Sequence, residues 1–223
     1  MNFVDTFLNW DVIVRVWPML VRGIGNTVAL ALTTIILGGI AGVAVCLVRL
    51  YAARPLRWLA IAYVDLFRAI PILVLLVLIY YALPFIDIRL DSFAAAALGL
   101  GRVFASFTAE VFRAGIQAIP KGQVEAASAL GLPFRVTIWK VILPQALRIA
   151  IPPQTSNSVA IAKDTSLASV VAMPDLLKQA TDAQALTANP SPLIAAACMY
   201  LIVLLPAVRL VAVLERRFSQ EHR

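Results

Sequence analysis

The chain has 223 residues, of which 61% are hydrophobic and 14% charged, and its mean hydropathy is +0.89. These values exceed what a water-soluble domain needs for one core, so a soluble globular enzyme is excluded as the default class. Cys46 and Cys198 lie in apolar runs and the single histidine is His222, so disulfide frameworks, Cys/His metal sites and histidine-based triads are not expected. The net charge of +7 comes from basic residues scattered between apolar runs, a pattern typical of membrane anchors and not of nucleic-acid binding.

Residues 1–21 contain two tryptophans, Trp10 and Trp17, and charged side chains among apolar positions. This mixture is too polar to cross a bilayer and is typical of a helix that lies in the membrane interface. We therefore predict an N-terminal interfacial segment over 1–21, a transmembrane domain over 22–215 and a cytoplasmic tail over 216–223.

Apolar runs long enough to cross a bilayer recur along the rest of the chain. A helix needs about 20 residues to cross a hydrocarbon core of about 30 Å. The second helix is expected to begin near Arg57, and the fifth near Ser191, within the stretch Asn189, Pro190, Ser191 and Pro192. The predicted fold is thus an all-α integral membrane protein with five transmembrane helices, based on the runs 23–48, 69–86, 92–113, 145–171 and 183–208.

Basic side chains beside the span ends indicate the orientation, because Lys and Arg resist translocation and accumulate in the cytoplasm. Eleven lie in one set of loops: Arg49, Arg54, Arg57, Arg113, Lys121, Arg135, Lys140, Arg148, Arg216, Arg217 and Arg223. Four lie in the opposite set: Arg15, Arg22, Arg89 and Lys178. With an odd number of spans, this asymmetry predicts an external N-terminus and a cytoplasmic C-terminus.

The longest stretch between spans is the loop 119–144, on the predicted cytoplasmic side. A short helix is expected from Gln123, with Glu125 in its first turn near the positive end of the helix dipole, and Gly131 and Pro133 are expected to end it. A helix of about two turns is not stable alone in water, so it needs a docking surface. That surface is either a partner protein or the chain's own membrane domain.

The amino-acid sequence of this loop resembles the signature motif of a known protein family. EAASALG, followed after nine residues by VILP, resembles the cytoplasmic EAA loop of importer-type ABC transporter permeases, whose pattern is E-A-A-x-x-x-G, nine residues, then I-x-L-P. Val141 replaces the usual Ile. The positions that match are Glu125, Ala126, Ala127, Gly131, Leu143 and Pro144.

Other segments look like the polar amino acid branch of these permeases. They are the GNT start of the first span, the FRAIP turn, and KDTSL at 163–167. The branch usually has Asn four residues after the first proline of its Pro-Pro pair, where this chain has Ser156, and this departure weakens any transfer of substrate specificity.

In the family that the loop resembles, the EAA helix is a coupling helix that sits in a groove of a separate ATPase subunit. The resemblance therefore implies that the six matching residues couple this chain to a cytoplasmic ABC ATPase dimer, which holds ATP and Mg. It further implies a second permease subunit, identical or related, and an extracytoplasmic amino-acid-binding protein. The chain itself contains no G-x-x-x-x-G-K-[ST] phosphate loop, so we expect it to be no enzyme and to bind no cofactor of its own.

Ionisable residues at membrane depth are costly and by default face a cavity or a partner. The run Lys163, Asp164, Thr165 and Ser166 follows Pro152 and Pro153, which are expected to break the fourth helix. The run therefore either lines the translocation path or is structural, and Arg102 is a further candidate for the path. Two pairs at a spacing of three residues are expected to form ion pairs near helix ends, Asp65 with Arg68 and Glu110 with Arg113.

These features together favour the permease subunit of an ATP-driven importer for polar amino acids in a bacterial inner membrane. An importer of another small solute, such as methionine or an amino-acid-like osmolyte, stays open because the EAA loop is shared widely. A secondary transporter driven by an ion gradient, or a channel, is the alternative that needs no ATPase.

Overall fold

The structure is a computed structural model that describes residues 3–220, and every regular element in that range is helical. The α-helices are α1 (Phe3–Phe7), α2 (Trp10–Tyr51), α3 (Arg54–Ala69), α4 (Ile72–Val77), α5 (Ser92–Gln117), α6 (Lys121–Ala129), α7 (Phe134–Val136), α8 (Leu143–Asp164), α9 (Leu176–Thr187) and α10 (Ser191–Gln220). Two π segments, η1 (Leu78–Ala82) and η3 (Thr137–Ile142), and two 3₁₀ segments, η2 (Leu83–Ile86) and η4 (Thr165–Val171), join them. The starts predicted for the third and fifth helices, at residues 92 and 191, are confirmed.

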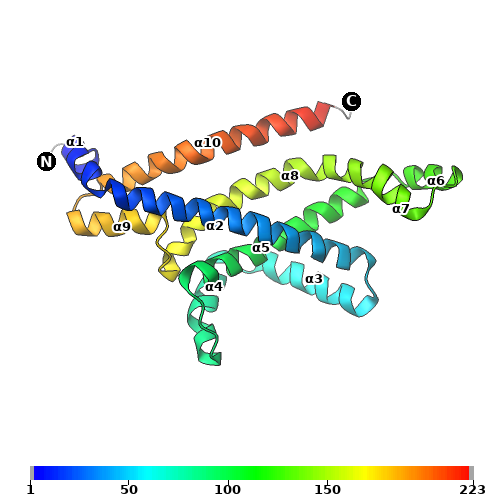
Figure 1. Cartoon of the computed structure of the whole chain (residues 1–223), viewed down its shortest axis with the longest axis horizontal. Helices are drawn as coiled ribbons and strands as arrows, with labels where there is room; N and C mark the ends of the chain where they lie inside the picture. The colour runs from blue at the N-terminus through cyan, green and yellow to red at the C-terminus, as the bar shows by residue number, and fades with distance from the viewer. Residues whose placement is uncertain (1–2, 221–223) are drawn as a thin grey trace.

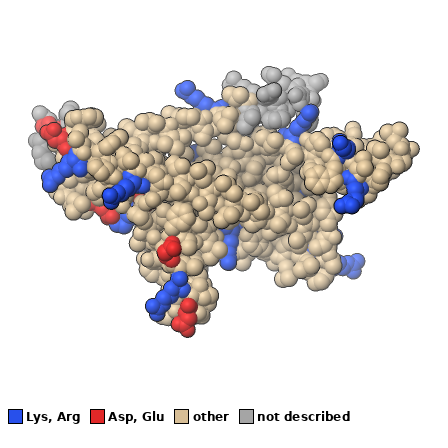
Figure 2. Space-filling model, in the orientation of Figure 1, with Lys and Arg blue, Asp and Glu red and all other residues tan. Residues whose placement is uncertain are grey.

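The long segments run in alternating directions along the long axis of the molecule (Figure 1). α2 is followed by α3, then by α5, α8 and α10, so that the N-terminus and the α6–α7 hairpin lie at opposite ends. Between α3 and α5, the segment of α4, η1 and η2 (72–86), which we name the α4 arm, projects across the long axis. On the face drawn in Figure 2, charged side chains gather near the two ends and at the tip of the α4 arm, and the belt between them is nearly free of charge. This distribution is the one that a bilayer imposes on a protein that crosses it.

Among the residues that the structure describes, three helices are long and apolar enough to cross a membrane, namely Asp5–Tyr51, Ser92–Gln117 and Ser191–Val213. The bent pair Arg54–Ala69 and Ile72–Ile86 is a fourth candidate. The run predicted as the fourth span corresponds to α8 and η4, whose polar side chains keep it outside this set. The count of five therefore stays a prediction.

The N-terminal boundary differs from the prediction. Residues 10–21 are the first turns of α2, continuous with the first predicted span, and Pro18 lies inside the helix. A proline removes one backbone donor, and burial of Val16 and Leu20 against α9 and α10 holds the helix together across that position. No helix boundary exists at residue 21, and the interfacial position of this segment remains a prediction.

The second predicted helix is two helices with a sharp bend. α3 begins at Arg54, three residues before the predicted start, and the axes of α3 and of the α4 arm differ by 106°. Pro71 explains the bend, because a proline pushes the preceding residue out of the helical region, and Ile70 has the extended ψ of 132°.

The predicted break at Pro152 and Pro153 is wrong. α8 continues through both prolines to Asp164 and changes to the 3₁₀ segment η4 only at Thr165. Each proline removes only its own N–H, so the rest of the helical hydrogen bonding is kept. α8 also packs against α5 and α10, and helices in membranes tolerate proline where neighbouring helices support them.

Small residues let α2 and α5 approach closely. A Cβ on Gly38 would lie 2.8 Å from the Gly101 carbonyl oxygen, and one on Gly42 would lie 2.5 Å from the Thr108 Cβ. Backbones that approach this closely gain packing contacts that larger side chains would prevent. The α2–α5 pair is therefore the centre of the bundle.

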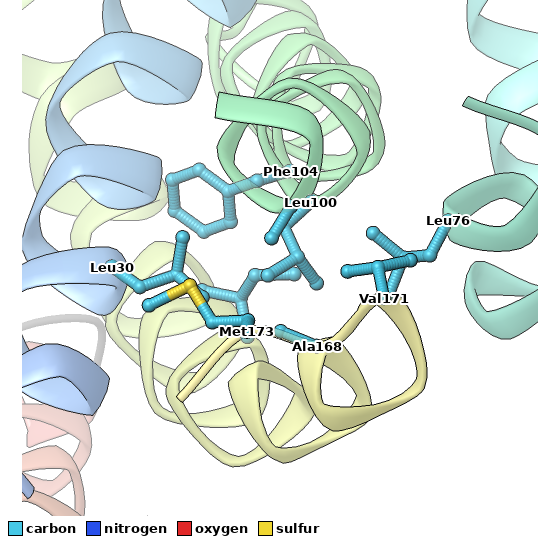
Figure 3. Close-up of a cluster of buried hydrophobic side chains, with 9 residues drawn as sticks. Leu30, Leu76, Leu100, Phe104, Ala168, Val171 and Met173 are labelled. Atoms are coloured by element: carbon cyan, nitrogen blue, oxygen red, sulfur yellow. The ribbon is translucent and has the colours of Figure 1, made fainter. Parts of the chain in front are cut away.

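One apolar cluster ties the α4 arm and η4 to that centre (Figure 3). Leu30 of α2 and Leu100 and Phe104 of α5 point toward Met173, which follows η4, and Val171 of η4 meets Leu76 of α4. All of these side chains are almost completely buried.

At the N-terminal end of the bundle, α9 is held against α2 by a set of contacts that we name the α2–α9 clasp. Asn26 Nδ2 donates to the Pro174 carbonyl at 2.8 Å, and the Leu176 amide donates to Thr27 Oγ1 at 3.0 Å. A Cβ on Gly23 would lie 2.8 Å from the Leu176 Cα. The sequence prediction missed α9, and the clasp gives Asn26 and Thr27 of the GNT segment a structural role.

Asp175 lies between Pro174 and Leu176 of the clasp, is fully buried and caps α9. Its Oδ1 accepts from the Lys178 amide at 2.7 Å, whereas its Oδ2 is buried without a partner among the described residues. Burial raises the pKa of this carboxyl from 3.8 to about 6, against the lowering effect of the Lys178 amide. The folded chain therefore binds the proton more tightly than the unfolded chain, and stability falls as the pH rises from about 4 to about 6.

We predict that Asp175→Asn stabilises the protein above pH 6, because asparagine keeps the cap acceptor without a buried charge. A pKa difference of about 2 corresponds to about 3 kcal/mol, which is the upper limit of the increase in the free energy of unfolding at pH 7.5. This increase should become smaller toward pH 4. Thermal unfolding in detergent at both pH values measures it. Asp91→Asn is the matched control, because Asp91 caps α5 in the same way but is exposed, and it should bring no gain. Equal effects at both caps would contradict burial as the cause.

Candidate functional site

The loop predicted to face a partner forms a hairpin at one end of the molecule (Figure 1). α6 begins at Lys121, two residues before the predicted start, directly after Pro120, whose extended ψ of 135° excludes it from the helix. Glu125 therefore lies in the second turn, and the predicted interaction with the helix dipole in the first turn is not formed.

The end of α6 is closed by hydrogen bonds around Gly131. The Leu132 amide donates to the Ala127 carbonyl at 3.1 Å, and the Gly131 amide donates to the Ser128 carbonyl at 3.0 Å. This pair of bonds is the Schellman motif, which requires a left-handed residue after the helix, and Gly131 has a φ of +71°. The left-handed backbone at this position therefore explains why the E-A-A-x-x-x-G pattern ends in glycine. The predicted end of the helix at Gly131 is confirmed.

One face of α6 is buried and the rest is open to solvent. Ala127 is 4% exposed, on the side where α6 packs against η3, whereas Glu125, Ala126 and Gly131 are exposed. A methyl group at position 127 permits this close packing. The face that carries Glu125 and Ala126 is open to solvent.

The remaining two predicted coupling residues lie on the other arm of the hairpin. Leu143 is the first residue of α8 and is half-buried, and the exposed Pro144 follows it. The backbone is helical from Phe134 through η3 into α8, so Pro144 lies inside a continuous helical run, directly after the π segment. The structure thus places the six residues on one hairpin, four on α6 and its cap and two at the start of α8.

Large apolar side chains are exposed on the same hairpin. Leu130 is 79% exposed, and Phe134 and Trp139 are each 66% exposed. Exposed apolar groups on a segment outside the spanning helices indicate a contact surface. The sequence analysis did not single out Phe134 and Trp139, although large apolar side chains in a loop between spans are a readable signal.

The polar run at the end of α8 divides into two kinds of side chain. Thr165 is fully buried and donates to the Ala162 carbonyl at 2.8 Å, and Ser166 donates to the Lys163 carbonyl at the same distance. Both hydroxyl hydrogens are therefore used within the helix. Lys163 is exposed and Asp164 half-buried, so these two side chains carry the charge that the run presents.

Arg102 does not join this run. It lines a separate cavity of about 330 Å³ among residues of α2, α3 and α5, and no residue of the run lines that cavity. Its guanidinium lies 5.9 Å from the ring centroid of Phe67.

One predicted ion pair is formed and the other is not. Arg113 binds Glu110, as expected, and Arg49 of α2 also donates to Glu110, at 2.7 Å. The spacing of 61 residues between Arg49 and Glu110 hides this second contact from sequence reasoning. Between Asp65 and Arg68 the described structure has no ion pair, and the Arg68 guanidinium lies 5.5 Å from the Phe107 ring centroid.

Within residues 5–213, whose side chains the structure describes, no group of three or more His, Cys, Asp or Glu side chains is placed to hold a metal ion. The candidate functional features of the described residues are therefore hydrogen-bonding groups, charged side chains and the exposed helix α6.

A family model described as "binding-protein-dependent transport system inner membrane component" matches residues 34–220. Among similar proteins, the L-cystine transport system permease protein TcyB of Bacillus subtilis is 36% identical over 178 residues, covering 79% of this chain and 76% of the relative. The probable glutamine ABC transporter permease protein GlnM of the same organism is 33% identical and covers 96% and 100%. The glutamate/aspartate import permease protein GltK of Escherichia coli O157:H7 is 32% identical and covers 94% and 97%.

Solved structures agree with these similarities. The crystal structure of an amino acid ABC transporter with histidines matches with a TM-score of 0.87 at 29% identity, covering 97% of this chain and 99% of the other. The inward-facing MetNI methionine ABC transporter matches with a TM-score of 0.71 at 22% identity, covering 88% and 96%, which shows the fold.

The Gly131 cap supports a direct test by hydrogen exchange. Gly131→Ala should speed amide exchange at the end of α6 by about tenfold, because a Cβ in the left-handed region costs about 1–2 kcal/mol. No atom lies within 4 Å of the added Cβ, so conformation alone causes the loss. Gly131→Asn is the matched control, since Asn tolerates this region and should exchange nearly as slowly as the parent protein. Equal acceleration in both variants would contradict the left-handed cap as the cause.

Proposed function

The chain belongs to the family of binding-protein-dependent transport system inner membrane components, and we propose that it is the membrane-spanning permease subunit of an ATP-driven importer for polar amino acids. It is no enzyme, because in this family the ATPase is a separate subunit. The observation that carries the proposal is the capped α6 hairpin at one end of a bundle that matches an amino acid ABC transporter over nearly its whole length.

In the proposed topology the chain crosses the membrane five times. The spans are α2, α3 with the α4 arm, α5, α8 and α10, which alternate in direction (Figure 1). The eleven-to-four distribution of basic residues supports a cytoplasmic position for α6 and the C-terminus, and an external position for α9. α8 is more polar than the other spans, which fits a helix that faces protein and a polar path.

The exposed face of α6 docks on a cytoplasmic ATPase, and we propose that Glu125, Ala126, Ala127, Gly131, Leu143 and Pro144 form this coupling site. Exposed Leu130, Phe134 and Trp139 extend the contact. Two ATPase subunits hold ATP and Mg, and their closure moves the hairpin and, through η3, the start of α8. Because α6 packs on η3, a displacement of α6 is transmitted to the helix that carries the polar run.

The complete importer in this proposal contains a second permease subunit, identical or related, and an extracytoplasmic binding protein, and it lies in a bacterial inner membrane. The five helices of one chain are too few to surround a polar path through the membrane. We place Lys163 and Asp164 on that path, with Thr165, Ser166 and Arg102 as lesser contributors, because a zwitterionic amino acid needs a cation for its carboxylate and an anion for its ammonium group.

Uptake into proteoliposomes tests the proposal. The chain, reconstituted with its ATPase and binding protein, should take up a polar amino acid from a labelled panel only when ATP is present on the ATPase side. Uptake by the chain without any ATPase would contradict the proposal and favour a secondary transporter.

Lys163→Gln and Asp164→Asn should lower that uptake by about tenfold at equal expression, the effect of losing one charge-assisted hydrogen bond. The matched controls are Lys178→Gln and Asp182→Asn, which remove the same charges from the ion pair on α9. If all four variants transport equally, the polar run does not line the path.

A further inference from the structure

A small cavity between the ends of α2, α3 and α5 is not used by the proposed function. Its volume is about 290 Å³. Three arginines line it together with one amide and two apolar side chains: Arg49, Arg57, Arg113, Gln117, Leu50 and Ile61. Arg49 is near the end of α2, Arg57 in the first turn of α3, and Arg113 near the end of α5.

The positive charge of this cavity is not balanced. Glu110 binds both Arg49, at 2.7 Å, and Arg113, and this carboxylate is the acidic partner that the described structure gives them. Arg57 has a weaker contact, from its Nη2 to the Leu50 carbonyl at 3.5 Å. Three guanidinium groups against one carboxylate leave an excess of two positive charges.

The excess charge can be balanced by an anion that accepts hydrogen bonds from guanidinium groups. Arginine recognises phosphate oxygens through paired, charge-assisted hydrogen bonds, and a carboxylate already holds Arg49 and Arg113 in place. Arg57 is exposed and its guanidinium makes only the contact with Leu50, so it is the group available to bind a phosphate.

The surroundings indicate that the phosphate belongs to a lipid. Next to Arg57, α3 exposes Leu56, Trp58 and Leu59, which are 54%, 69% and 67% exposed. Apolar side chains with a tryptophan at a helix start are typical of the headgroup level of a bilayer. The α2–α3 corner also lies toward the α6 end of the molecule (Figure 1), so it lies at the cytoplasmic leaflet in the proposed orientation.

We propose that this cavity binds the phosphate of an anionic phospholipid of the cytoplasmic leaflet, with Arg57 as its principal ligand and Arg113 and Gln117 beside it. Leu50 and Ile61 form the apolar wall, and the exposed side chains of α3 contact the acyl chains. The proposal rests on the proposed orientation of the chain but not on its transport activity. Basic pockets between spanning helices on the cytoplasmic side are the sites where anionic headgroups are expected to bind.

Native mass spectrometry of the full chain from nanodiscs tests this assignment. The nanodiscs contain equal amounts of phosphatidylglycerol and phosphatidylcholine, and the lipids retained on the protein are counted. The parent chain should retain phosphatidylglycerol in preference to phosphatidylcholine, and Arg57→Gln should lower that retention by about tenfold, the effect of losing one charge-assisted hydrogen bond.

Arg54→Gln is the matched control, because Arg54 carries the same charge one turn earlier on α3 but does not line the cavity. It should retain the lipid like the parent chain. Equal losses in both variants, or no preference in the parent chain, would overturn the proposal, and so would displacement of the lipid by millimolar inorganic phosphate, since the ligand would then be a free anion. The measurement needs no ATPase, so a failure of transport leaves its outcome unchanged.

Discussion

The account of this protein depends on how a helix of nine residues persists in water at the end of a membrane bundle. An isolated helix of that length is unstable, because nucleation costs more than a few hydrogen bonds return. In α6, two interactions offset this free-energy cost of nucleation. The left-handed Gly131 closes the last turn through the Leu132 and Gly131 amides, and Ala127 buries its methyl group where α6 packs against η3. The exposed face of α6 is thereby held in a fixed orientation, and η3 connects the hairpin to α8, the helix that ends at Lys163 and Asp164.

The bundle behind this hairpin is fixed by close contacts of small residues and not by large core side chains alone. Gly38 and Gly42 bring α2 against α5, and Gly23 brings α2 against the start of α9. The α2–α9 clasp adds hydrogen bonds that buried backbone and side-chain groups need in a medium without water. These contacts fix one end of the molecule while the hairpin projects from the other.

The sequence predicted those features that depend on local chemistry. The start of α10 between Pro190 and Pro192, the Gly131 cap and the Glu110–Arg113 pair were all predictable, because each is decided within a few residues. The resemblance indicated a turn at FRAIP, which ends at Pro71, but the apolar run continues across it, so the run 69–86 was predicted as one span and the 106° bend was not foreseen. The two prolines of α8 led to the opposite error, a predicted break that is not formed, because packing of α8 against α5 and α10 has no local signal in the sequence. Contacts between distant segments, such as Arg49 with Glu110 and Asn26 with Pro174, have no local signal.

The central claim is that α6 lies in the cytoplasm and α9 outside, and thiol labelling tests it most directly. Single cysteines replace the exposed residues Ser128 of α6 and Ala185 of α9 in a Cys198→Ser background, which leaves only the buried Cys46. The account predicts that a membrane-impermeant maleimide labels Ala185→Cys in spheroplasts, and Ser128→Cys only in inside-out vesicles. Rapid labelling of Ser128→Cys in intact spheroplasts would contradict it, because no cytoplasmic ATPase could then reach the hairpin.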